Sequence, residues 1–151
     1  MGERAEEHGS KTDGNVCPSE GQPDTLTTAL AWIRARNVRN EAFGHELFFD
    51  PAWDMLLDLF VNRCRDRKVS ISDLCVGTPV PPTTALRWIT VLENKGLILR
   101  NADPKDRRRQ FLSLTPVAVA RMEVALDRAI ESDRRYGLGR LRLVDQVNDL
   151  L

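Results

Sequence analysis

Near the N-terminal end of the chain, apolar residues recur with the three- and four-residue spacing of an amphipathic helix. One face of this predicted helix is formed by Leu26, Leu30, Ile33 and Asn37. The helix is expected to span residues 26–40, because the segment 43–50 contains a glycine and runs into a proline.

A second apolar stripe follows Pro51 and predicts another amphipathic helix. Proline suits the first turn of a helix, and the carboxylate of Asp50 can cap the free N–H groups of that turn. The stripe consists of Trp53, Leu56, Leu57, Phe60 and Val61.

Two shorter helices follow, separated by a turn. Ser70 begins the first of them, Asp73 completes a carboxylate variant of the capping box, and Gly77 ends the helix. The run Thr-Pro-Val-Pro-Pro at 78–82 forms a rigid turn, because no helix can continue through it. The next helix is expected over residues 82–94. Its inward positions are Ala85, Trp88, Ile89 and Leu92.

A β-hairpin is predicted next, from two short apolar runs at 97–99 and 110–114. The loop between them holds five basic and two acidic residues. We call the hairpin over residues 97–114 the wing. Thr115 then caps a long helix that starts at Pro116, and a final short helix is expected before residue 151. The apolar stripe of the long helix is Val119, Met122, Leu126, Ala129 and Ile130.

The predicted fold class is mainly α with a small β-hairpin: a winged helix-turn-helix with flanking helices at both ends. The segment before residue 25 is rich in Gly, Ser, Glu, Asp and Pro, and it cannot bury enough apolar surface to offset its ordering. The predicted organisation is a disordered tail over 1–24, a helix and linker over 25–50, a winged helix-turn-helix over 51–115, and C-terminal helices over 116–151.

Composition and charge narrow the function classes. Hydrophobic residues make up 42% and charged residues 29% of the 151 residues, and no apolar run approaches the roughly 20 residues that cross a bilayer. No apolar signal-peptide core is present, so a cytoplasmic protein without membrane contact is expected. The net charge of zero conceals an asymmetry: residues 51–115 carry eleven basic and seven acidic side chains, so this segment can face a polyanion.

The sequence offers no constellation for catalysis or metal binding. The two histidines, His8 and His45, are far apart in the sequence, and neither a nucleophile motif nor a phosphate-binding glycine loop is present. The three cysteines, Cys17, Cys64 and Cys75, lack metal-ligand spacing. We therefore expect neither an enzyme nor a cofactor, and we interpret Cys64 and Cys75 as small buried apolar residues.

The helix-turn-helix pattern predicts double-stranded DNA as the partner, with the helix over 82–94 in the major groove. Arg87 can pair bidentately with guanine, the commonest specific contact to a base. The basic loop of the wing can reach a minor groove, whose negative potential attracts arginine. The candidate DNA-binding residues are Pro82, Thr83, Thr84, Arg87, Thr90, Lys105, Arg107, Arg108 and Arg109.

Three motifs in order resemble the MarR family of transcriptional regulators, over about residues 50–118. They are Leu-Glu-Asn-Lys-Gly-Leu-Ile at 92–98, Asp-Pro-Lys-Asp-Arg-Arg-Arg at 103–109, and Leu-Ser-Leu-Thr at 112–115. The resemblance implies that Arg108 is the wing-tip arginine and that Asp103 and Asp106 brace the wing. The sequence departs from the family where Val117 or Ala118 replaces a usual glycine, and in the proline pair at 81–82.

The resemblance also implies a homodimer formed by the N- and C-terminal helices, whose apolar stripes lack a partner in a small domain. It further suggests a pocket for a small aromatic effector. The residues that could line this pocket are Trp32, Arg36, His45, Phe48 and Trp53. We favour the alternative that these aromatic residues are core or dimer contacts. A winged-helix module that binds protein and not DNA is the alternative function, since fold does not settle function.

Overall fold

The computed structural model describes residues 25–45, 47–106 and 108–136. The predicted N-terminal tail, the predicted last helix and Arg107 lie outside the described residues. The helices are α1 (Thr25–Phe43), α2 (Pro51–Cys64), α3 (Ile71–Gly77), α4 (Pro82–Asn94) and α5 (Pro116–Tyr136). The strands are β1 (Val69–Ser70), β2 (Ile98–Ala102) and β3 (Gln110–Leu114).

Helix α2 lies at the centre of the fold. Helices α1, α3, α4 and α5 and strand β3 pack around it. The predicted apolar stripe is therefore only part of its buried surface. Met55, Leu57 and Leu59 are buried together with Phe60 and Val61. Burial of a helix on most of its circumference explains why its apolar residues are not confined to one face.

The predicted helix starts are confirmed in atomic detail. The backbone N–H of Trp53 donates to the carboxylate of Asp50 at 3.3 Å. At α3, the Asp73 N–H donates to the Ser70 hydroxyl at 3.1 Å, and the Ser70 N–H donates back to the Asp73 carboxylate at 3.1 Å. The hydroxyl and backbone N–H of Ser70 hold the pKa of Asp73 below its ordinary value, because both donate to the ionised carboxylate.

Helix α1 differs from its prediction in which residues face the core and in where the helix ends. Ala29 and Asn40 are buried, whereas Asn37 is exposed, so the prediction that Asn37 lies on the inward face is wrong. The helix continues to Phe43, three residues beyond the expected end. Gly44 then ends it with a φ of 97° and donates its N–H to the carbonyl of Asn40 at 2.9 Å.

The sheet has three antiparallel strands in the order β1-β3-β2. The predicted hairpin is confirmed, with Ile98 opposite Leu114 and Ala102 opposite Gln110. The first strand of the hairpin is longer than predicted, because its last residues are exposed and carry no apolar signal. The two-residue strand β1 was not predicted, since two residues are too few to show an alternating pattern.

Thr115 joins three elements at the base of the wing. It caps α5 as predicted, accepting a hydrogen bond from the N–H of Ala118 at 3.1 Å. Its own hydroxyl donates to the carbonyl of Gly96 at 2.8 Å, and its N–H donates to the carbonyl of Leu97 at 3.0 Å. Gly96 follows α4 with a φ of 65°, a conformation that glycine adopts without strain.

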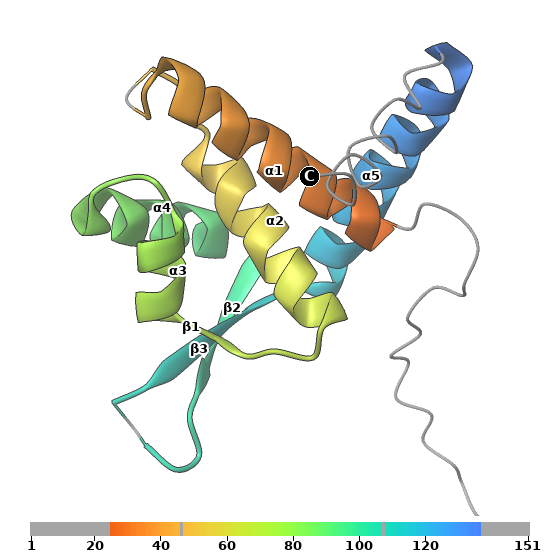
Figure 1. The fold of residues 1–151 in the computed structure, drawn as a ribbon. Coiled ribbons are helices and arrows are strands. Elements are labelled where there is room, and N and C mark those ends of the chain that lie inside the picture. The colour runs from red at the N-terminus through yellow and green to blue at the C-terminus, as the bar shows by residue number, and fades with distance from the viewer. Residues whose placement is uncertain (1–24, 46, 107, 137–151) are drawn as a thin grey trace, which may run out of the picture.

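The elements separate into two ends of the molecule (Figure 1). Helices α3 and α4 lie beside one another, and the wing projects below them. Helices α1 and α5 lie together at the other end, in contact with each other and with α2. No helix among the described residues is long and apolar enough to cross a membrane.

The packing of α3 gives a first prediction. Leu74 is 0% exposed, whereas Val76, two residues later, is 87% exposed. Leu74→Ala should lower the free energy of unfolding by about 2–5 kcal/mol, because it removes buried methyl groups and leaves a cavity. Val76→Ala is the matched control and should change it by less than about 0.5 kcal/mol. Urea denaturation of both variants checks the difference, and equal effects would contradict this packing.

Candidate nucleic-acid interface

Helix α4 is held in place by the packing of its inward side against the core, and its opposite side, which is mostly polar, faces solvent. Ala85, Ile89 and Leu92 are buried, as predicted, against the core that α2 and α3 also form. Trp88 is half-buried beside them. On the opposite side, the exposed candidate residues are Pro82, Thr83, Arg87 and Thr90, while Thr84 is half-buried.

The start of α4 has unusual capping. Pro81 is the N-cap residue, and no side chain caps the helix. The first-turn N–H groups of a helix carry partial positive charge, so an uncapped start leaves donors for a phosphate oxygen. The paired prolines thus replace a polar cap with a rigid, open helix end.

Two side chains on or near α4 are held by local bonds. The Thr90 hydroxyl donates to the carbonyl of Leu86 at 3.1 Å, so its oxygen remains an acceptor for other groups. The Arg100 guanidinium donates to Glu93 at 2.9 Å and ties the base of the wing to the end of α4. Arg87 forms no ion pair with another residue in the described part of the chain.

The acids of the wing contact its backbone. The Asp103 carboxylate accepts from the N–H of Lys105 at 2.9 Å, and the Asp106 carboxylate accepts from the N–H of Arg108 at 2.9 Å. The Asp103 N–H donates to the carbonyl of Arg109 at 3.0 Å and closes the loop. Among the described residues, neither acid forms an ion pair with Arg108, whose side chain is exposed.

Basic residues that the sequence reasoning passed over lie beside the wing. The segment 63–68 reads Arg-Cys-Arg-Asp-Arg-Lys, and this run of charges was the available signal. The Lys68 amine lies 5.5 Å from the centre of the Phe111 ring, and the Arg109 guanidinium lies 4.9 Å from it. Two cations from separate segments of the chain therefore lie over one aromatic ring near the loop end of the wing.

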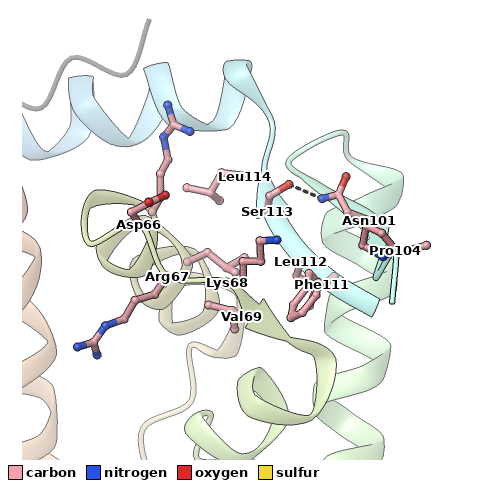
Figure 2. A pocket seen from close by; sticks show the side chains of 13 residues that line it. Asp66, Arg67, Lys68, Val69, Asn101, Pro104, Phe111, Leu112, Ser113 and Leu114 are labelled. Atoms are coloured by element: carbon pink, nitrogen blue, oxygen red, sulfur yellow. Dashed lines mark hydrogen bonds between the residues drawn. The ribbon is translucent and has the colours of Figure 1, made fainter. Parts of the chain in front are cut away.

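A hollow of about 600 Å³ opens between this basic segment and the sheet (Figure 2). Its apolar lining includes Phe111, Leu112 and Leu114. Asn101 donates to the Ser113 hydroxyl at 2.8 Å across the two strands of the wing. Figure 2 shows the Lys68 side chain extending toward Ser113, whereas the Arg67 side chain points away from these residues.

The predicted effector-pocket residues do not gather at one place. Trp32 and Trp53 pack with ring centres 5.6 Å apart, on α1 and α2. Phe48 instead lies under the guanidinium of Arg39 at 4.4 Å. His45 is exposed and borders a shallow surface hollow with Phe49 and residues 78–81.

Half-buried Arg36 and buried Asp54 form an ion pair between α1 and α2. Burial raises the pKa of Asp54, while the guanidinium of Arg36 opposes this rise. Arg36 Nε is buried and has no hydrogen-bond partner in the described part of the chain. One donor of this guanidinium is therefore unsatisfied.

The remaining chemistry of the described residues is sparse. No group of three or more His, Cys, Asp or Glu residues in the described ranges could hold a metal ion. Cys64 and Cys75 are both half-buried, and burial raises the pKa of the Cys75 thiol. A raised pKa keeps that thiol protonated at neutral pH, which disfavours reaction as a thiolate.

Residues 54–118 match the family described as a winged helix DNA-binding domain. Over 63 residues the chain is 41% identical to a Thauera aromatica protein assigned as a transcriptional regulatory protein for the hcr operon, covering 40% of this chain and 38% of that protein. The fold is similar to the S. aureus MepR–DNA complex, with a TM-score of 0.51 and 17% identity over 81% of this chain and 98% of that chain. It is also similar to NadR in complex with 4-hydroxyphenylacetate, with a TM-score of 0.51 and 21% identity over 89% and 97%.

The Arg36–Asp54 pair gives a second prediction. Arg36→Met leaves the buried carboxylate without its counter-ion, so the pKa of Asp54 should rise further and stability at pH 7 should fall by about 3–5 kcal/mol. A raised folded-state pKa means that the folded chain binds the proton more tightly than the unfolded chain. The loss should therefore shrink as the pH falls through the folded-state pKa of Asp54.

Urea denaturation at pH 7 and at lower pH measures this dependence. The double variant Arg36→Met/Asp54→Leu is the control, because it removes both charges and should recover most of the stability. A loss that is independent of pH, or a double variant as unstable as the single one, would contradict the assigned pairing.

Proposed function

We propose that the chain regulates transcription by binding a specific double-stranded DNA sequence, as a winged helix protein with the fold of MarR-family regulators. The single observation that carries this proposal is the match of residues 54–118, which include both α4 and the wing. These two elements project at the same end of the molecule (Figure 1). A helix and a basic hairpin side by side suit adjacent grooves of one duplex.

In this proposal α4 enters the major groove, which is about 12 Å wide and admits one helix. The exposed hydroxyls of Thr83 and Thr90 and the guanidinium of Arg87 face the DNA. The open helix start at Pro82 and Thr84 lies near a phosphate, where the helix dipole favours negative charge.

The wing enters the neighbouring minor groove. The exposed cations of its loop are Lys105, Arg108 and Arg109, and we include Arg107 from its place in the sequence. The carboxylates of Asp103 and Asp106 support this role, because their hydrogen bonds to the loop backbone shape the tip that carries the arginines. Their negative charge would otherwise oppose binding to a polyanion.

We further propose that the chain acts as a homodimer. Exposed apolar side chains on α1, on α5 and in the segment after α1 support this, because pairing of two copies would bury them. They are Val38, Phe43, Leu47, Phe49, Val117 and Val124. The α1 stripe itself packs within the chain, so these residues and not that stripe carry the proposal. Sedimentation at micromolar concentration should give twice the chain mass.

Trp32 and Trp53 pack against the core, which supports the favoured alternative that they are core contacts. A small aromatic acid that binds beside this pair is the second candidate role that we propose for them. The unsatisfied Arg36 Nε supports this site, since a carboxylate could accept its N–H. Because NadR has been crystallised with 4-hydroxyphenylacetate, this acid is a suitable probe. Quenching of tryptophan fluorescence on titration, and its absence in Trp32→Phe, tests the site.

Selection from a random duplex library, followed by mobility shifts over a range of salt concentrations, tests the proposed function. A specific regulator should enrich one sequence motif and bind it far more tightly than random DNA at the same salt. Failure to enrich any motif would overturn the proposal and favour the alternative of a winged-helix module that binds protein.

Arg87 gives the third prediction. Arg87→Ala should weaken binding to the selected site by about 1–3 kcal/mol and relax the preference at one base pair, because a bidentate contact to guanine is lost. Affinity measured for all four base pairs at each position locates the effect. An equal loss on every sequence would mean that Arg87 contacts phosphate and not a base.

The wing gives the fourth prediction. Arg108→Ala should bind the selected site more weakly while folding and sedimenting like the unaltered chain, and the loss should be largest with A·T-rich flanks. Two variants of Asp106 distinguish a bracing role of its carboxylate from a simple effect of its negative charge on DNA binding. Asp106→Asn keeps the acceptor for the Arg108 N–H and removes a negative charge, so it should bind DNA at least as tightly as the unaltered chain.

Asp106→Ala also removes the acceptor, and bracing therefore predicts weaker binding for it than for Asp106→Asn. Fluorescence anisotropy with the selected duplex measures both variants. Tighter binding by Asp106→Ala would show that the acid opposes DNA and braces nothing.

A further inference from the structure

One exposed side chain on α4 differs in kind from its neighbours. Leu86 is 45% exposed, although the residues three before it and four after it are the threonines Thr83 and Thr90. Residues at these spacings are neighbours on a helix surface. Arg87 follows directly. An apolar side chain thus lies within the surface that the proposed function directs to the major groove.

Packing within the chain does not account for Leu86. The inward side of α4 is complete without it, because Ala85, Ile89 and Leu92 are all buried. Exposed single leucines are common on protein surfaces, and their position decides whether they matter. Apart from Pro82, four residues before it, the exposed neighbours of Leu86 on α4 are polar, so this face is not the broad apolar patch that a protein partner would need.

The surroundings of Leu86 also restrict what it can recognise. The hydroxyl of Thr90 donates to the Leu86 carbonyl, which fixes the Thr90 side chain one turn away. Leu86 itself offers neither a hydrogen-bond donor nor an acceptor. Against a polar base edge it would remove water without replacing the lost hydrogen bond, and that is unfavourable.

In the major groove, the 5-methyl group of thymine is the apolar group that a base pair exposes. We propose that Leu86 contacts this methyl group and thereby specifies a T·A base pair in each half of the recognised site. The inference rests on the proposed function, because it requires α4 to lie in the major groove. It makes Leu86 a determinant of sequence specificity alongside Arg87.

Uracil provides a direct test, because it pairs as thymine does and lacks only the methyl group. Each thymine of the library-selected duplex is replaced by deoxyuridine in turn, and the dissociation constant of the full chain is measured. One position in each half-site should lose about fourfold in affinity, the effect of removing one methyl group from an apolar contact. No uracil-sensitive position would overturn the inference.

The variants Leu86→Ala and Leu86→Gln should bind the thymine and uracil duplexes equally. Val76→Ala is the control, because Val76 is an exposed apolar residue on α3, outside α4 and the wing. It should keep the full difference between thymine and uracil. Thermal denaturation confirms that each variant is folded.

The outcomes distinguish failure of this inference from failure of the proposed function. A chain that selects no duplex overturns the proposed function together with the role of Leu86. A chain that selects a duplex overturns the role of Leu86 alone if the thymine preference survives in both Leu86 variants.

Discussion

The placement of α4 depends on the burial of its inward side against the core shared with α2 and α3. Ala85 and Ile89 are completely buried there, and Met55 of α2 and Leu74 of α3 belong to the same core. Small and branched side chains at this contact bring the helices close together and allow few arrangements. The direction of every exposed side chain on α4 follows from this packing, because a helix that buries one side must present the other.

Much of this architecture could be predicted from the sequence, for reasons that differ between elements. The capping box at Ser70 and Asp73 and the proline at the start of α2 are local signals, and local signals fixed these helix starts. The inward side of α4 followed from spacing alone. The inward side of α1 did not, because buried Asn40 is polar and exposed Asn37 was assigned to the wrong side.

The interface could be predicted only in part, because helical spacing is a local signal whereas loop geometry and contacts between separate segments are not. The positions of Thr83, Arg87 and Thr90 follow from helical spacing once the inward side is known. The bonds of the wing acids to backbone N–H groups could not be anticipated, since they depend on the exact turn of the loop. The contact of Lys68 with Phe111 brings together residues that are distant in sequence, and no local pattern signals such a contact.

Thr115 has a mechanical consequence. Its hydroxyl bonds to Gly96 at the end of α4 and caps α5, so the two helices meet at a single short joint. A joint held by hydrogen bonds at several atoms resists bending, and a tilt of α5 would therefore rotate the attached strands and α4 with it. Displacement under rotation grows with distance from the pivot. The tip of the wing, at the far end of the hairpin, would thus travel further than the base of the wing beside the pivot.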